Sequence, residues 1–187
     1  MIRAFLAIDL PASLRPGLAR VQDELKKCGA DVKWVPVGNV HLTLKFFGQI
    51  PEAKVLDITR AAGEIARWQP PFTLKVAGAG AFPSNKNPRV VWLGVHGDLD
   101  ALAGFFRQLE AAFAGLGFPP EDRAFSPHLT LGRVRSPAGR TELARCLATL
   151  PAAECAAFQV NEIILFRSNL SPQGATYLPL KVMPLGG

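Results

Sequence analysis

Cysteine and histidine are scarce in this chain, which contains three of each. Cys28, Cys146 and Cys155 form neither a Cys-x-x-Cys pair nor a cluster with the spacing of zinc ligands. Their number is odd, and these positions exclude a zinc finger of ordinary spacing. We therefore expect reduced thiols, which are typical of a cytoplasmic protein.

Long apolar runs and acidic residues are also in short supply. No apolar stretch is long enough to span a bilayer, and the apolar run at residues 4–8 is too short for a signal peptide. We expect a cytoplasmic protein with no membrane partner. The 15 Asp and Glu residues against 21 Lys and Arg give a net charge of +6. This excess favours an anionic partner, such as nucleic acid or a phosphorylated small molecule.

The 187 residues, 49% of them hydrophobic, suffice for one domain with a buried core. Period-two alternation and short apolar runs predict strands, and apolar residues at three- and four-residue steps predict helices. The third helix is expected to bury Leu99, Leu102, Phe106, Leu109 and Phe113. The expected strands are 2–9, 32–35, 41–47, 72–76, 90–95, 128–131, 157–167 and 175–182, and the expected helices are 14–28, 52–68, 98–113 and 143–150.

One tetrapeptide, His-Leu-Thr-Leu, occurs twice, at residues 41–44 and 128–131. A strand directs alternate side chains to opposite faces, so the histidine and the threonine share one face and the leucines share the other. Each copy is therefore expected to be a half-buried strand with one polar face. Two of the three histidines of the chain lie in this identical context.

The order of the expected elements repeats with the same offset as the tetrapeptide, 87 residues. Adding 87 to positions 2, 11, 52 and 71 gives 89, 98, 139 and 158, which begin the later strand, helix, helix and strand. We interpret this as duplication of one strand-helix-strand-helix-strand unit, at about 2–80 and 89–182, within a single bilobal domain of residues 1–187. Two similar lobes would bring the two motifs face to face across a cleft.

A pair of histidines across a cleft is suited to chemistry at phosphorus. Displacement at phosphorus needs a base behind the attacking oxygen and an acid behind the leaving oxygen, and two imidazoles supply both near neutral pH. Each threonine lies about 6–7 Å along its strand, from where its hydroxyl can donate to a phosphate oxygen. Neither motif has carboxylates at metal-ligand spacing, so we expect no metal and no cofactor. A structural role for the histidines is the alternative.

Two segments around the motifs carry a family resemblance. Residues 34–48 and 125–133 resemble the 2H phosphoesterase superfamily, which has two His-x-Thr-x motifs, and residues 5–11 and 166–177 extend the match over most of the chain. Within the superfamily the pattern is most similar to the RNA 2',3'-cyclic phosphodiesterases, first known as 2'-5' RNA ligases. The resemblance implies an α+β, bilobal, duplicated fold. In that fold two antiparallel sheets face a central cleft, with helices on the outside.

The resemblance also implies a reaction and roles for the motif residues. The reaction is metal-independent hydrolysis of RNA 2',3'-cyclic phosphate ends to 2'-phosphomonoesters. His41 would be the general acid on the 3' oxygen and His128 the general base on water, while Thr43 and Thr130 would hold the phosphate. The reverse direction would join such an end to a 5'-hydroxyl through a 2'-5' linkage. The expected partners are RNA termini, including those of tRNA fragments, and the protein is expected to be a monomer.

Three further residues are candidates for substrate binding. Arg133 follows the second motif, and its guanidinium would neutralise a phosphate. Strict alternation places Arg133 on the leucine face, so this role requires a bulge or twist at Gly132. Lys45 and Phe47 share the alternation of the first histidine and are expected to reach the cleft, where the ring would stack on a base. Phe46 is expected in the core.

Two other functions are compatible with the same residues. One is a related 2H activity on 2'-5' oligonucleotides or small cyclic nucleotides, because the motifs contact only the phosphate that all these substrates share. The other is an RNA-binding module without catalysis, although intact histidines and threonines in both copies argue against it.

Overall fold

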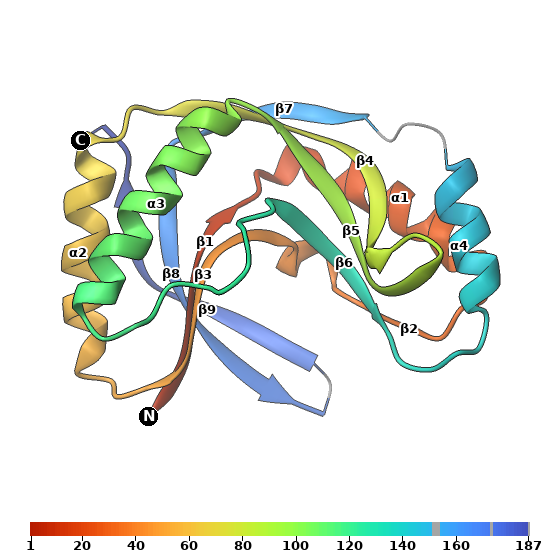
Figure 1. The fold of residues 1–187 in the computed structure, drawn as a ribbon, viewed down its shortest axis with the longest axis horizontal. Coiled ribbons are helices and arrows are strands. Elements are labelled where there is room, and N and C mark those ends of the chain that lie inside the picture. The colour runs from red at the N-terminus through yellow and green to blue at the C-terminus, as the bar shows by residue number, and fades with distance from the viewer. Residues whose placement is uncertain (151–153, 173, 187) are drawn as a thin grey trace.

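The computed structural model describes residues 1–150, 154–172 and 174–186 of the chain. These residues form four α-helices and nine strands, whose arrangement can be followed in Figure 1. The helices are α1 (Arg15–Lys26), α2 (Lys54–Trp68), α3 (Leu99–Gly115) and α4 (Arg140–Thr149). The strands are β1 (Ile2–Asp9), β2 (Val32–Trp34), β3 (His41–Ile50), β4 (Phe72–Ser84), β5 (Asn87–Gly97), β6 (His128–Val134), β7 (Glu154–Val160), β8 (Glu162–Ser171) and β9 (Gly174–Pro184).

The strands form one antiparallel sheet, which curls strongly (Figure 1). The strand order is β7-β4-β5-β6-β3-β1-β8-β9, with β2 beside β6. The α+β class is as predicted, but the expectation of two separate sheets is wrong. The two motif strands β3 and β6 pair directly, through Leu42 and Leu129, and this pairing joins the two halves.

The strand order is symmetric about the contact between β3 and β6. Counting outward from this contact, β3, β1, β8 and β9 on one side correspond to β6, β5, β4 and β7 on the other. A duplication would produce this arrangement, although the duplicated units themselves stay a prediction. The single strand expected at 157–167 is instead two strands, β7 and β8, separated at Asn161.

The helices lie in two pairs, α2 with α3 at one end of the sheet and α1 with α4 at the other (Figure 1). Helix α3 buries Leu102, Phe105, Leu109 and Phe113. The expectation that Leu99 and Phe106 belong to this buried face is wrong. Leu99, at the first residue of the helix, is 38% exposed. Residues 102, 105, 109 and 113 form the three- and four-residue spacing that faces the sheet, and this spacing leaves out Phe106. Phe106 is half-buried and lines a cavity at the surface.

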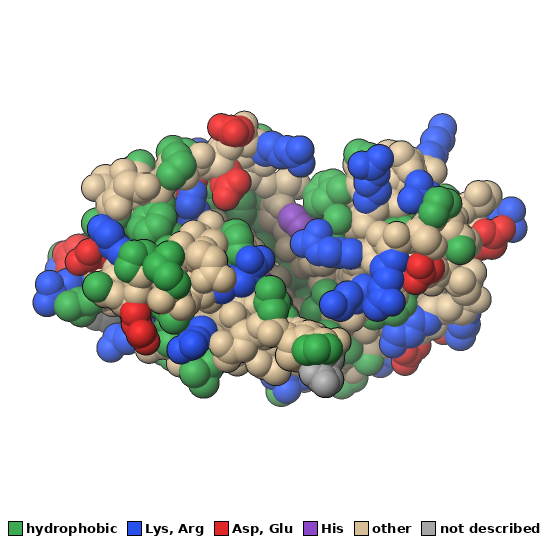
Figure 2. Space-filling view, turned by 90° about the horizontal axis from the view of Figure 1, so that it is seen from below, with side chains coloured by type: hydrophobic (Ala, Val, Ile, Leu, Met, Phe, Trp, Pro, Cys, Tyr) green, Lys and Arg blue, Asp and Glu red, His purple; other side chains and the backbone are tan. Residues whose placement is uncertain are grey.

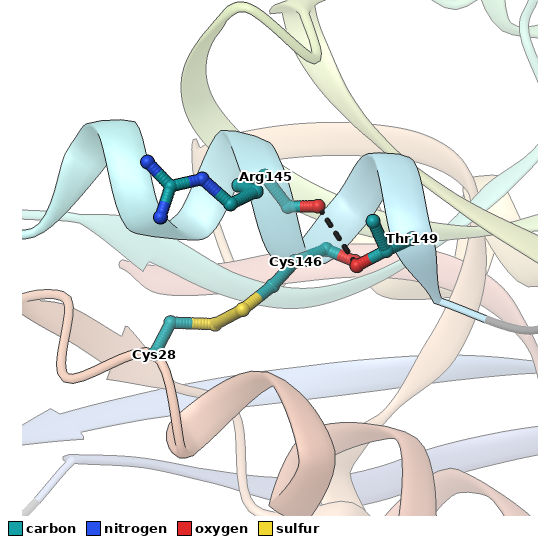
Figure 3. Close-up of a disulfide and its surroundings, with 4 residues drawn as sticks. All are labelled: Cys28, Arg145, Cys146 and Thr149. Atoms are coloured by element: carbon teal, nitrogen blue, oxygen red, sulfur yellow. Dashed lines mark hydrogen bonds between the residues drawn. A yellow bond between two sulfur atoms is a disulfide. The ribbon is translucent and has the colours of Figure 1, made fainter.

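A disulfide joins Cys28, which follows α1, to Cys146 of α4 (Figure 3). The two Cα atoms lie 6.6 Å apart although the residues are 118 positions apart in sequence. The expectation of reduced thiols is therefore wrong for this pair. Sequence spacing gave no sign of it, because the pair depends on the contact between two distant helices. The side chain of Cys155 lies outside the described part of the structure.

Loss of this disulfide is expected to destabilise the protein. Cleavage of a cross-link that closes so long a loop increases the entropy of the unfolded chain, and the free energy of unfolding should fall by about 2–4 kcal/mol. Urea unfolding of the wild type with and without a reductant measures the effect. In Cys146→Ser the reductant should change nothing, and an unaltered wild-type midpoint would contradict the prediction.

No helix in the described residues is long and apolar enough to cross a membrane.

Candidate active site

The two His-Leu-Thr-Leu motifs meet where β3 pairs with β6. Leu42 of β3 is paired with Leu129 of β6, and this antiparallel register puts His41 on the side of Thr130 and Thr43 on the side of His128. The four polar side chains of the two motifs therefore form one patch on the face opposite the leucines.

Both imidazole rings are held in the same way. The Nδ1 atom of His41 lies 2.7 Å from the carbonyl oxygen of Asn39, and that of His128 lies 2.7 Å from the carbonyl oxygen of Ser126. A carbonyl oxygen only accepts hydrogen bonds, so Nδ1 carries the hydrogen in each ring. In the neutral ring this leaves Nε2 as the atom that can accept a proton.

Two adjoining cavities surround the motifs. The first has a volume of about 510 Å³ and is lined by His41, Thr43, Thr130 and Arg133 among others. The second, of about 710 Å³, is lined by His128, and Thr43 and Phe46 line both cavities. Figure 2 shows this region as a hollow, with a histidine side chain inside it and Lys and Arg side chains around it.

A β-bulge in β3 determines which side chains follow His41 and Thr43 into the first cavity. Ala7 of β1 pairs with Thr43 while Leu6 pairs with Lys45, so Leu44 is an extra residue that reverses the alternation. The expectation that Lys45 and Phe47 reach the cleft is wrong for this reason, and both are buried in the interior. Phe46, which was expected in the core, is 43% exposed and lines the cavities instead.

A second bulge, in β6, brings Arg133 into the first cavity. Trp92 of β5 pairs with Thr130 while Val91 pairs with Gly132, so Leu131 is the extra residue. The reversal places Arg133 on the face of Thr130, as its expected role requires. At Gly132 a Cβ atom would lie 2.6 Å from Cγ1 of Val32, so a glycine is needed for β2 to pair here.

A buried polar side chain supports each bulge from behind. Gln22 of α1 donates from Nε2 to the carbonyl oxygen of Leu131, at 3.1 Å. At the other bulge, Nζ of Lys45 forms an ion pair of 2.9 Å with Glu110 of α3 and donates to the carbonyl oxygen of Pro119 at 2.6 Å. Contacts with the helices thus help to determine which side chains of β3 and β6 face the cavities.

Three residues that line the first cavity, Arg3, Phe5 and Tyr177, were not predicted from the sequence. The His41 ring stacks on Phe5 with 4.7 Å between centroids, and Tyr177 of β9 meets it edge-on at 5.3 Å. The Arg3 guanidinium lies over the Phe46 ring, 4.4 Å from its centroid. Burial raises the pKa of Tyr177, which the charges of Arg133 and Arg3 oppose. Alternation along β1 could have placed Arg3 and Phe5 on one face, whereas nothing in the sequence points Tyr177 toward His41.

Burial lowers the pKa of His41 below its ordinary value, and the hydrogen bond with Asn39 and the charge of Asp9 only partly oppose this effect. The free protein thus favours the neutral ring. The unfolded chain, with a histidine pKa of about 6.5, binds a proton more readily. Stability contributed by neutral His41 should therefore be complete above about pH 6.5 and should decrease as pH falls toward the lowered folded pKa.

Urea unfolding of the wild type and His41→Asn between pH 5 and 8 tests this linkage. As pH falls, the unfolding free energy of the wild type should decrease relative to that of His41→Asn, because only the wild type contains this histidine. A pH-independent difference would contradict the lowered pKa.

No group of three or more His, Cys, Asp or Glu residues that could hold a metal ion occurs in the part of the chain that the structure describes. Metal independence stays a prediction.

Comparison with known families gives the class of the protein. The sequence model described as LigT-like phosphoesterase matches the chain twice, at residues 8–92 and 94–177. Each match contains one His-Leu-Thr-Leu motif. The chain therefore belongs to the LigT-like family of 2H phosphoesterases.

Individual relatives define the family more closely. An RNA 2',3'-cyclic phosphodiesterase of Methanothermobacter thermautotrophicus is 41% identical over 184 residues, 98% of this chain and 99% of the relative. One from Aquifex aeolicus is 34% identical, covering 100% and 99%. The crystal structure of E. coli LigT complexed with 3'-AMP covers 100% of this chain and 99% of that one, with a TM-score of 0.79 and 31% identity. Within its class, the chain belongs to the RNA 2',3'-cyclic phosphodiesterase family.

Proposed function

We propose that this protein hydrolyses 2',3'-cyclic phosphates at RNA ends and leaves 2'-phosphomonoesters. The observation that carries the proposal is the pair of imidazoles, each anchored through Nδ1 to a backbone carbonyl, in two motif strands that pair directly. This arrangement leaves two Nε2 atoms for proton transfer. The names of the relatives support the choice of substrate.

In the proposed reaction the two histidines divide the proton transfers. His128 takes a proton from water, the water oxygen bonds to phosphorus, and the bond from phosphorus to the 3' oxygen breaks as His41 protonates that oxygen. Thr43 and Thr130 donate hydrogen bonds to the non-bridging oxygens, and Arg133 balances their charge. The lowered pKa of His41 in the free protein does not prevent this role, because an anionic phosphate beside the ring raises the pKa again.

The terminal nucleoside, in this proposal, occupies the first cavity on the side of His41. Phe5 and Tyr177 line this cavity, and Phe46 takes the stacking position that had been assigned to Phe47. By microscopic reversibility the same groups would join the cyclic end to a 5'-hydroxyl and form a 2'-5' linkage. We propose RNA termini, those of tRNA fragments included, as substrates of a monomeric protein.

An RNA oligonucleotide that ends in a 2',3'-cyclic phosphate, incubated with the protein and EDTA, tests the proposal. We expect a 2'-phosphate, which ³¹P NMR and chromatography against standards distinguish from a 3'-phosphate. The double variant His41→Asn/His128→Asn serves as the inactive control. A folded wild-type protein that retains the cyclic end, or that produces a 3'-phosphate, would refute the proposal.

A further inference from the structure

A groove adjoins the first cavity beside β1 and β8, and we call it the Arg167 groove. Its volume is about 310 Å³, at the lower end of the range for small-ligand sites. Arg3, Ser168 and Leu170 line both the first cavity and the groove. The two spaces therefore meet, and a ligand in the first cavity can extend into the groove.

The Arg167 groove lies where two paired strands separate. The pairing of β1 with β8 runs from Ala7 with Ile164 to Ala4 with Arg167 and ends there. Residues 1–3 on one side and 168–170 on the other lie beyond this last pair, and they line the groove. Strand β8 stays paired with β9 as far as Ser171, so this wall of the groove is part of the sheet.

The side chains of Arg3 and Arg167 give the groove a positive charge. The described residues that line it include no Asp or Glu, and neither arginine forms a salt bridge within the described part of the chain. Nε of Arg167 donates to Oδ1 of Asn169 at 3.1 Å, which orients the guanidinium and leaves its terminal nitrogens for another acceptor. Guanidinium groups bind phosphates through paired N–H donors, so two of them without a carboxylate favour a phosphodiester.

Two other spaces adjoin the first cavity and suit a phosphodiester less well. One, of about 270 Å³, shares His41 and Tyr177 with the first cavity, but Asp9 lines it and no Lys or Arg is among its described lining residues. The other is the second cavity, on the side of His128, where the attacking water must reach phosphorus in the proposed mechanism. The phosphodiester is attached to the 5' carbon of the terminal nucleoside, which this mechanism places on the side of His41. The Arg167 groove therefore fits both the charge and the position of this group.

We propose that the Arg167 groove binds the phosphodiester group that precedes the terminal nucleotide of the RNA, an inference that rests on the proposed function. Arg167 contacts the non-bridging oxygens of this group, and Arg3 lies between it and the terminal nucleoside in the first cavity. Met1 and Leu170, which are 76% and 67% exposed, border the groove and provide apolar surface for the preceding nucleoside. The protein then prefers an oligonucleotide end to a small cyclic nucleotide. The two motifs cannot make this distinction, because they contact only the phosphate that both substrates share.

Three substrates and two variants test the inference. The substrates are adenosine 2',3'-cyclic phosphate, the dinucleotide ApA with a 2',3'-cyclic phosphate end, and the same dinucleotide with an uncharged methylphosphonate linkage. Chromatography of the products gives kcat/KM for each substrate. Arg167→Gln removes a cation from the groove and leaves the first cavity unchanged, because Arg167 does not line that cavity. Arg60→Gln is the matched control, since Arg60 is exposed on α2 and lines neither the two cavities nor the groove.

We expect the wild-type kcat/KM to be about tenfold higher for the dinucleotide with the phosphodiester linkage than for the other two substrates, since a charge-assisted contact with a phosphate has an effect of this order. Arg167→Gln should lose about tenfold on that dinucleotide and stay within about twofold of wild type on the other two substrates. Arg60→Gln should leave all three values unchanged.

Equal wild-type values for the cyclic mononucleotide and the dinucleotide, or for the charged and the uncharged linkage, would overturn the inference. So would an Arg167→Gln variant that loses nothing, that loses equally on all three substrates, or that loses no more than Arg60→Gln. Absence of hydrolysis of all three substrates by the wild type would instead refute the proposed function. Thermal unfolding of Arg167→Gln shows whether it is folded, and the methylphosphonate comparison in the wild type tests the inference even if it is not.

Discussion

Replacing His128 by asparagine is expected to reduce kcat/KM for hydrolysis of a 2',3'-cyclic phosphate by about 10²–10⁴-fold, the usual contribution of a positioned acid or base. His41→Asn should reduce it by a similar factor. The two rings are held by equivalent hydrogen bonds, since each Nδ1 donates to the backbone carbonyl oxygen of the residue two positions before it. Neither ring can take over for the other, because the two must act on opposite sides of phosphorus.

His96→Asn is the matched control for these two variants. His96 is the third histidine of the chain, is exposed on β5 and does not line either cavity. Steady-state hydrolysis and urea unfolding should be measured on all three variants. Activity in His96→Asn should equal that of the wild type. Full activity in His41→Asn or His128→Asn would refute the catalytic assignment, and a loss that only accompanies unfolding would assign a structural role to the ring.

The pH dependence of the wild type should be bell-shaped, because one ring must act protonated and the other neutral, and the two limbs belong to the pair of rings together. Burial lowers the pKa of His41 in the free protein, to which kcat/KM refers. Bound phosphate favours the imidazolium and raises that pKa. The alkaline limb of kcat should therefore lie at higher pH than the alkaline limb of kcat/KM. An alkaline limb of kcat at lower pH than that of kcat/KM would contradict this order.

Much of the site was predictable because a strand has a period of two residues. Alternation alone placed His41 with Thr43 and His128 with Thr130, and the shared offset of 87 suggested that the two motifs face each other across a cleft. The same rule failed at the last residue of each motif, because Leu44 and Leu131 are extra residues in their strands. A bulge is defined by the partner strand and its support, so alternation within one strand cannot locate it. Phe46 and Arg133 reach the cavities because each follows a bulge.

Contacts between distant segments account for the other differences. The disulfide between Cys28 and Cys146 and the position of Tyr177 beside His41 both join segments more than a hundred residues apart. The direct pairing of β3 with β6, which makes one sheet of two halves, was equally hidden. Local patterns predict which side chains share a face, but not which segments pack together.

Replacing Lys45 by methionine is expected to reduce the free energy of unfolding by about 3–5 kcal/mol. Lys45 and Glu110 are 4% and 10% exposed in their side chains and lie 2.9 Å apart. Removal of the cation leaves the buried carboxylate without its counter-charge. The carbonyl oxygen of Pro119 also loses its hydrogen bond, while the other carboxylate oxygen of Glu110 still accepts from the backbone N–H of Glu121.

Urea unfolding of Lys45→Met, Lys45→Met/Glu110→Gln and Lys54→Met measures this effect. Lys54 and Asp57 form an exposed ion pair of 3.6 Å on α2, so Lys54→Met should cost about 1 kcal/mol or less. The glutamine of the double variant removes the unpaired charge but keeps an acceptor for Glu121, so this variant should be more stable than Lys45→Met. A loss in Lys45→Met no greater than in Lys54→Met would contradict the role of the buried pair. Lys45 lies next to the extra residue Leu44, so this buried ion pair ties β3 to α3 directly after the bulge, a contact that alternation in the strand cannot reveal.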